Sequence, residues 1–289
     1  AEDRASPIEL IWPMVGGAII DHEAAILMLQ GFSQRLRSGS RLSSAWVMTA
    51  NPAQKADHVT RALVDVVRES MIATVALIPD LMAVAIGQDC VFDVAGARPC
   101  NVVHLGAGYG SAGVLEDGHI KQRRQISQAG AWLDLCVQRA LFDKLGYVAP
   151  LEVCREVKHA LGTLELTSMP RQWQHHVTDV DGHAHEVELT SADIQPVLVN
   201  GMAPIVDELR WFIKLLPAEY ASAIREGGIL LSGGCAELRD MSFWLAGQLN
   251  VPVRVARDPS KAVVQGIAKF IADSAHWAAL TKGGKKQRK

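Results

Sequence analysis

Residues 229–245 read ILLSGGCAELRDMSFWL, and this stretch decides how the rest of the chain is interpreted. An apolar strand is expected at residues 229–232, and it runs directly into Gly233 and Gly234 before a helix expected at residues 237–249. Glycines at such a turn let the backbone approach a flat or anionic ligand near the helix N-terminus. The stretch therefore indicates a ligand-binding turn, with a plain strand-to-helix turn as the alternative.

A second glycine-rich stretch, residues 104–111 (HLGAGYGS), occupies the turn of a predicted β-hairpin. Its strands are expected at residues 101–105 and through Val114, with a further turn at residues 116–118. Alternating glycines let backbone N–H groups point at phosphate oxygens, but the same residues suit any tight turn that needs positive φ. By itself, this stretch leaves a phosphate loop and a plain hairpin turn open.

The segments around these two turns alternate between strands and helices, which predicts an α/β fold. Residues 175–186 (HHVTDVDGHAHE) predict an exposed hairpin, because their histidines follow no metal-ligand spacing. Pro196 predicts a late start or a kink in a long helix expected between residues 190 and 216. Further strands are expected at 45–49, 75–78 and 251–255, and further helices at 53–73, 81–87, 131–145, 152–161 and 261–271.

The composition is that of an ordinary soluble globular chain, because 49% of its 289 residues are hydrophobic and 21% are charged. The net charge of −2 argues against nucleic acid as a partner, and the basic residues in 282–289 (KGGKKQRK) are expected to form a solvated end. Five cysteines without C-x-x-C spacing favour a reducing, cytoplasmic location. Pro79 and Asp80 interrupt the apolar run 72–86, so neither a membrane span nor a signal peptide is expected.

Several segments follow one another in an order that is typical of one family. The last block is the most specific, because it pairs the glycine turn at Gly233 and Gly234 with Asp258-Pro259 further along. Together the segments resemble MreB, the bacterial actin homologue, from about residue 8 to residue 273. They are residues 11–21 (IWPMVGGAIID), 78–87 (IPDLMAVAIG), 102–114 (VVHLGAGYGSAGV), 129–134 (AGAWLD), 156–162 (EVKHALG), 229–245 and 251–270 (VPVRVARDPSKAVVQGIAKF).

The resemblance implies the actin, hexokinase and heat-shock ATPase fold, in which two similar α/β domains enclose a nucleotide in the cleft between them. It places the remainder of the first domain at residues 1–103, the second domain with an inserted subdomain and a return segment at 104–273, and a basic tail at 274–289. ATP or ADP with Mg²⁺ is the cofactor that the family implies. The residues implied to bind it are Gly106, Ala107, Gly108 and Tyr109 of the second phosphate hairpin, Lys158 of a helix, and Gly233 and Gly234 of the adenosine turn.

The sequence departs from the family pattern at the phosphates. The first phosphate hairpin, a D-x-G-T-type loop, is absent, which suggests truncation at the N-terminus. His104 stands where the second hairpin carries the aspartate that positions metal-bound water. Tyr109 and Gly110 replace the two hydroxyl residues after the glycines. These changes remove groups that the family uses around the metal and the phosphates.

Further departures concern acidic residues. The position of the catalytic carboxylate falls near Val59, and Asp57 lies two residues away, so its side chain is turned by about 200° on a helix. Residues 79–81 (Pro-Asp-Leu) replace a Glu-Glu-Pro stretch. Arg155 occupies the place of a ribose-contacting glutamate, and Lys158 alone survives from that pair, with a plain surface lysine as its alternative role. No residue is therefore assigned a catalytic or metal-binding role.

These features predict a cytoplasmic, filament-forming or scaffold protein similar to MreB, with weak or absent ATPase activity. Its expected partners are further copies of itself or another actin-like protein, with peripheral membrane contact left open. The alternative is an active, ATP-binding and polymerising bacterial actin whose first phosphate loop is missing from the sequence. A sugar or acetate kinase of the same superfamily fits poorly, because no acid motif for a phosphoryl acceptor is found. The tryptophans Trp12, Trp132, Trp211 and Trp244 are expected to be packed in the core.

Overall fold

The computed structural model describes residues 11–36, 45–51, 57–71, 73–90, 95–166, 169–178 and 182–273. These residues form two compact units, one that extends to Leu77 and one that starts at Ile78. The tail expected at 274–289 lies outside the described residues. The boundary expected between actin-like domains after residue 103 stays a prediction.

The first unit combines two helices with two pairs of strands. The helices α1 and α2 pack on each other, and His22 of α1 contacts Glu69 of α2 at 3.2 Å. Asp21 accepts a hydrogen bond from the backbone N–H of Ala24 (2.9 Å), which satisfies a free donor at the start of α1. In chain order the elements are β1 (Met14–Val15), β2 (Ala18–Ile19), α1 (His22–Leu36), β3 (Ala45–Asn51), α2 (Asp57–Met71) and β4 (Ala73–Pro79), whose last two residues belong to the second unit.

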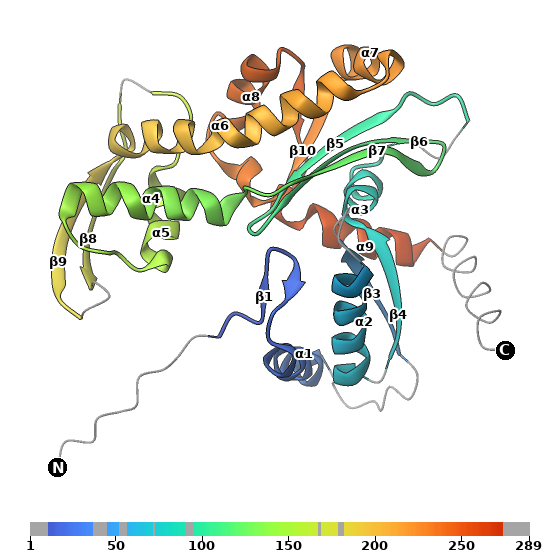
Figure 1. Ribbon diagram of the computed structural model, residues 1–289, viewed down its shortest axis with the longest axis horizontal. Coiled ribbons are helices and arrows are strands. Elements are labelled where there is room, and N and C mark those ends of the chain that lie inside the picture. The colour runs from blue at the N-terminus through green and yellow to red at the C-terminus, as the bar shows by residue number, and fades with distance from the viewer. Residues whose placement is uncertain are drawn as a thin grey trace. The chain divides into compact units, whose positions relative to one another are not determined.

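The second unit is built on a five-stranded mixed sheet with the strand order β11-β10-β5-β6-β7 (Figure 1). The central strand β5 pairs antiparallel with β6 and parallel with β10, and β10 in turn pairs parallel with β11. The carboxyl ends of β5 and β10 therefore lie side by side at one edge of the sheet. The strands are β5 (Cys100–Leu105), β6 (Gly110–Glu116), β7 (His119–Ile126), β10 (Ile229–Ser232) and β11 (Val253–Val255).

Helices cover both faces of this sheet because successive side chains of each strand point to opposite faces. Val103 and Leu231 enter a large core with α4 to α8, whereas Val102 and Leu230 enter a smaller core with α3 and α9. A separate hairpin of β8 (Gln172–Thr178) and β9 (Ala184–Thr190) precedes α6. The helices are α3 (Asp80–Gly87), α4 (Gly130–Leu145), α5 (Leu151–Leu161), α6 (Ser191–Leu215), α7 (Ala218–Gly227), α8 (Met241–Leu249) and α9 (Ala262–Ala272), with short 3-10 turns at Gly234–Glu237 and Pro259–Lys261.

Most of the expected elements are confirmed, and the exceptions have local causes. The helix expected from residue 237 begins only at Met241, because Asp240 adopts a left-handed conformation (φ 64°) after a 3-10 turn. The helix containing Pro196 has no late start, because a capping box between Thr190 and Asp193 begins it at Ser191. The expectations missed β1, β2, α1, β7 and α7 altogether.

The expected packing of the tryptophans is confirmed for one of the four. Trp244 is buried, whereas Trp12, Trp132 and Trp211 are exposed. The indole N–H of Trp132 donates to the backbone oxygen of Gly201 (2.9 Å), so a polar contact holds this ring on the surface of α6. The guanidinium of Arg124 lies 5.6 Å from the ring of Trp211. Within the described ranges, no helix is both long and apolar enough to cross a bilayer.

Candidate functional site

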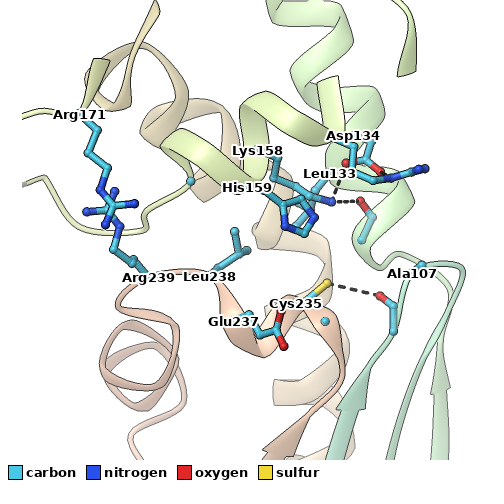
Figure 2. Close-up of a pocket in the computed structure, with 15 residues that line it drawn as sticks. Ala107, Leu133, Asp134, Lys158, His159, Arg171, Cys235, Glu237, Leu238 and Arg239 are labelled. Atoms are coloured by element: carbon cyan, nitrogen blue, oxygen red, sulfur yellow. Dashed lines mark hydrogen bonds and ion pairs between the residues drawn. The ribbon is translucent and has the colours of Figure 1, made fainter. Parts of the chain in front are cut away.

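A pocket of about 230 Å³ lies in the second unit, where the two glycine-rich turns meet α4 and α5 (Figure 2). The turn after β5 contributes Gly106 and Ala107, and the turn after β10 contributes Gly234 and Cys235. Because β5 and β10 are parallel neighbours, both turns emerge at the same edge of the sheet. This is the edge at which α/β sheets commonly bind ligands.

The turn after β10 depends on glycine at position 233. Gly233 has φ +90°, and a Cβ atom there would lie 2.1 Å from the carbonyl oxygen of Leu105. Its N–H donates to the carbonyl oxygen of Pro259 (2.8 Å), which connects the turn to the Asp258-Pro259 segment. The Sγ of Cys235 contacts the carbonyl oxygen of Gly106 at 3.4 Å. The absence of a side chain at 233 is therefore what lets the two turns touch.

The turn after β5 is held against the N-terminus of α4. The N–H groups of Gly130 and Ala131 donate to the carbonyl oxygens of Gly106 (3.0 Å) and Ala107 (2.7 Å). These bonds satisfy two of the donors that a helix leaves free at its start. The glycine turn therefore lines one side of the pocket and fixes where α4 begins.

A buried charge cluster forms the wall made by α4 and α5. The Nζ of Lys158 lies 2.6 Å from Oδ1 of Asp134 and donates to the carbonyl oxygen of Gly130 (2.9 Å), as Figure 2 shows. Arg155 approaches the other carboxylate oxygen of Asp134 with its Nε at 3.4 Å. Asp134 and Lys158 are only 3% and 8% exposed. The structure therefore rules out a plain surface role for Lys158.

The pocket carries more positive than negative side chains. The positive groups are the side chains of Arg155, Lys158, Arg171 and Arg239, and the negative groups are the carboxylates of Asp134 and Glu237. The Nε of Arg239 is shielded from solvent and has no hydrogen-bond partner in the described part of the chain. A buried donor without a partner is costly, so an acceptor atom of a ligand would stabilise it. These residues fit an anionic ligand.

The residues expected to bind the cofactor divide into two groups. Gly106, Ala107, Lys158 and Gly234 line the pocket. Gly108, Tyr109 and Gly233 are not among the described residues that line the pocket. Gly233 holds the turn in place through its bond to Pro259, whereas Tyr109 is hydrogen-bonded to Asp80.

Asp80 is a buried carboxylate beside the β5–β6 hairpin, and the sequence did not reveal its contacts. It begins α3, is almost fully buried, and accepts hydrogen bonds from the N–H of Leu81 (2.7 Å), the hydroxyl of Ser111 (2.9 Å) and the hydroxyl of Tyr109. Burial is the largest influence and raises the pKa of Asp80, although these bonds oppose the shift. Burial and the Asp80 carboxylate also raise the pKa of Tyr109. The Pro-Asp-Leu stretch therefore keeps one carboxylate bonded to residues of the β5–β6 hairpin.

His104 is a neutral residue of β5 whose ring contacts the neighbouring strand β10. Its Nδ1 lies 2.9 Å from the hydroxyl oxygen of Ser232, the residue paired with it on β10. Burial lowers the pKa of His104 to about 4, so the ring carries no charge at neutral pH. In the first unit, Asp57 is the exposed first residue of α2, and Val59 is half-buried.

Acidification is expected to destabilise the protein through His104. Its pKa is 6.5 in a free chain and about 4 in the fold, so between these values the unfolded chain binds a proton that the folded chain does not. The stabilisation is complete above pH 6.5 and is lost as the pH falls toward 4. We expect His104 to account for a loss of about 2–3 kcal/mol between pH 7 and pH 4.5.

Urea unfolding of the wild type and of His104→Asn at both pH values measures this contribution. Asparagine keeps a polar contact with Ser232 but does not titrate, so the variant should lose less stability on acidification than the wild type. Equal losses in the two proteins would show that His104 is not the group responsible.

The fold matches known structures closely. It aligns with the crystal structure of MreB 5 of Spiroplasma citri bound to AMPPNP, with a TM-score of 0.87 and 23% sequence identity. The alignment covers 98% of this chain and 84% of that chain. It also aligns with the MamK double helical filament, with a TM-score of 0.76 and 15% identity over 91% of this chain and 81% of the other. The protein therefore has the actin-like fold, as expected.

The sequence comparison narrows this class to one family. A family model described as "MreB/Mbl protein" matches residues 4–278. The cell shape-determining protein Mbl of Bacillus cereus is 26% identical over 262 residues, which cover 90% of this chain and 78% of that protein. The chain belongs to the MreB/Mbl family, and the expected family is confirmed.

Proposed function

We propose that the chain is a cytoplasmic cytoskeletal or scaffold protein that self-associates, binds an adenine nucleotide in the pocket and hydrolyses it weakly or not at all. The similarity to a MamK filament supports self-association. The similarity to an MreB 5 structure bound to AMPPNP supports nucleotide binding. Peripheral membrane contact and another actin-like protein as a partner remain part of the proposal, with no role for nucleic acid.

The observation that carries the nucleotide proposal is the pocket formed by both glycine turns together with its excess of cations. In this arrangement Gly106 and Ala107 would lie beside the phosphates, and Gly234 would allow close packing of the adenosine. Arg239 offers a donor that has no acceptor among the described residues. Lys158 would act mainly through its position, because Asp134 already compensates its charge at 2.6 Å. ATP or ADP with Mg²⁺ therefore fits the charge of this site.

Weak hydrolysis is proposed because His104 and Asp80, the polar groups near the β5–β6 turn, already form hydrogen bonds within the protein. Cleavage of a phosphoanhydride needs neutralisation by Mg²⁺ and a group that positions water. Mg²⁺ prefers oxygen ligands, and His104 is a half-buried neutral imidazole bonded to Ser232. The oxygens of Asp80 accept hydrogen bonds from its own neighbours.

The alternative, an active polymerising ATPase, is favoured by one observation. Asp80, at the start of α3, places a carboxylate at the β5–β6 hairpin, although hydrogen bonds from Ser111 and Tyr109 already occupy it. If nucleotide displaced these bonds, the carboxylate would be available for water. Asp80→Asn tests this role, because it keeps the size of the side chain and removes its charge.

We expect the purified chain to show no Mg²⁺-dependent release of phosphate from ATP above a protein-free control. We also expect it to sediment as polymer to the same extent with ATP, with ADP and without nucleotide. A fluorescent ATP analogue displaced by unlabelled ATP checks binding separately. Robust turnover that is lost in His104→Asn or Asp80→Asn, or polymer that forms only with ATP, would establish the active alternative.

A further inference from the structure

Two cysteines outside the pocket bring their thiols together. Cys90 follows the end of α3, where its N–H donates to the carbonyl oxygen of Ala85 (3.0 Å), and Cys100 is the first residue of β5. Both pack against the smaller core between the sheet and the helices α3 and α9. Their side chains are hydrogen-bonded to each other, and both are free thiols. Both are half-buried, so small molecules can reach them.

The surroundings of Cys90 are positively charged. The guanidinium of Arg254, on β11, reaches the sulfur of Cys90 with its Nη2 at 3.5 Å. Asp89 is the neighbouring acid, but its carboxylate is paired with Arg257 (2.8 Å) and with Lys269. A cation beside a thiol favours the thiolate, which is the nucleophilic form.

The two thiols differ in how readily they lose a proton. The hydrogen bond from Cys100 is the largest influence and, with Arg254, lowers the pKa of Cys90 to about 7, against the opposing effects of burial and Asp89. The pKa of Cys100 is raised by the same pairing and by burial. Cys90 therefore carries a substantial thiolate fraction at neutral pH, whereas Cys100 stays protonated. Burial instead raises the pKa of the other three cysteines, Cys136, Cys154 and Cys235.

We propose that Cys90 and Cys100 form a modification site at which hydrogen peroxide reversibly closes an intramolecular disulfide. The Cys90 thiolate attacks one oxygen of the peroxide, the O–O bond breaks, and the products are a sulfenic acid on Cys90 and hydroxide. The sulfur of Cys100 then attacks the sulfenic sulfur, which forms the S–S bond, and the sulfenic hydroxyl leaves with the Cys100 proton as water. The hydroxide from the first step takes up the proton that Cys90 released to solvent on ionising, which gives the second water. Two thiols are oxidised by two electrons and one peroxide is reduced, and a dithiol reductant reverses the change.

The test treats the reduced full chain with hydrogen peroxide, denatures it in acid and labels the remaining thiols with a maleimide for mass spectrometry. We expect three maleimides on the oxidised monomer instead of the five on the reduced chain, and a disulfide-linked peptide pair that contains Cys90 and Cys100. Dithiothreitol should restore all five sites. Cys136→Ser is the matched control, because it removes a half-buried thiol outside the pair and should leave the disulfide unchanged.

Two further variants separate the two chemical steps. Cys100→Ser should stop at the sulfenic acid, which dimedone traps on Cys90. Arg254→Gln should slow the oxidation at pH 7 by about fivefold if it raises the pKa by one unit, whereas Arg254→Lys should keep most of the rate. The rate in the wild type should rise with pH around a midpoint near 7, set by Cys100, Arg254 and Asp89 as the groups facing Cys90. Oxidation of Cys90 no faster than of Cys136, or disulfides only between chains, would overturn the proposal.

Discussion

Asp134→Ala is expected to lower the free energy of unfolding by about 3–5 kcal/mol, because it leaves a buried cation without its counter-charge. Lys158 is 8% exposed, and its Nζ lies 2.6 Å from the Asp134 carboxylate. The remaining partner of Lys158, the carbonyl oxygen of Gly130, carries no formal charge. Arg155 would also lose its contact and add a second positive charge nearby. Urea unfolding at pH 7, followed by circular dichroism, measures the effect.

The same helix supplies a control. Asp143 and Arg139 of α4 form an ion pair at 3.2 Å, but their side chains are 59% and 79% exposed. Solvent screens such a pair, so Asp143→Ala should change stability by no more than about 0.5 kcal/mol. Asp134→Leu combined with Lys158→Met removes both buried charges and should recover most of the loss. If Asp134→Ala is as mild as Asp143→Ala, the expectation that Asp134 compensates a buried charge on Lys158 is wrong.

Gly266→Ala is expected to cost about 1–3 kcal/mol or more, because α3 and α9 meet with no room for a methyl group. A Cβ at this position of α9 would lie 1.7 Å from the carbonyl oxygen of Ala83 in α3. Backbone atoms cannot move aside as a flexible side chain does, so the two helices would have to separate. The thermal midpoint and the urea midpoint should both fall.

Gly247→Ala is the matched control, because Gly247 lies in α8 and a Cβ there would meet nothing within 4 Å. Alanine is the better helix former, so this variant should gain about 0.5–1 kcal/mol. The two substitutions are chemically identical and should have opposite signs. A gain in stability for Gly266→Ala as well would mean that α3 and α9 are not in close contact.

Local patterns predicted the elements that carry strong periodicity. Apolar runs next to glycines predicted β5, β6 and β10, since these central strands are buried on both faces of the sheet. The edge strand β7 (HIKQRRQI) was missed, because an edge strand that exposes alternate side chains contains few apolar residues. The start of α8 was misplaced by four residues, because the left-handed Asp240 is not signalled by any glycine.

The nucleotide-binding role of the expected residues stays a prediction, but the structure shows which of them lie together. Both glycine turns meet at the pocket as the family resemblance implied, and Gly106, Ala107, Lys158 and Gly234 line it. Asp134 lies in a segment that carries the resemblance, so its position was visible, but its bond to Lys158 was not. The places of Arg171 and Arg239 in the pocket had no local signal, because the elements that form the pocket lie far apart in the sequence.

The sequence by itself determined the family, the alternation of strands and helices, and the two glycine turns. Each of these is recognised from short motifs whose residues are close neighbours along the chain. The tertiary structure alone decided the states of the ionisable groups. Partial burial keeps His104 neutral, the ion pair with Asp134 compensates the charge of Lys158, and the hydrogen bond from Cys100 together with Arg254 lowers the pKa of Cys90. These properties depend on solvent exclusion and on distances between residues from different elements, and only the packed fold defines either one.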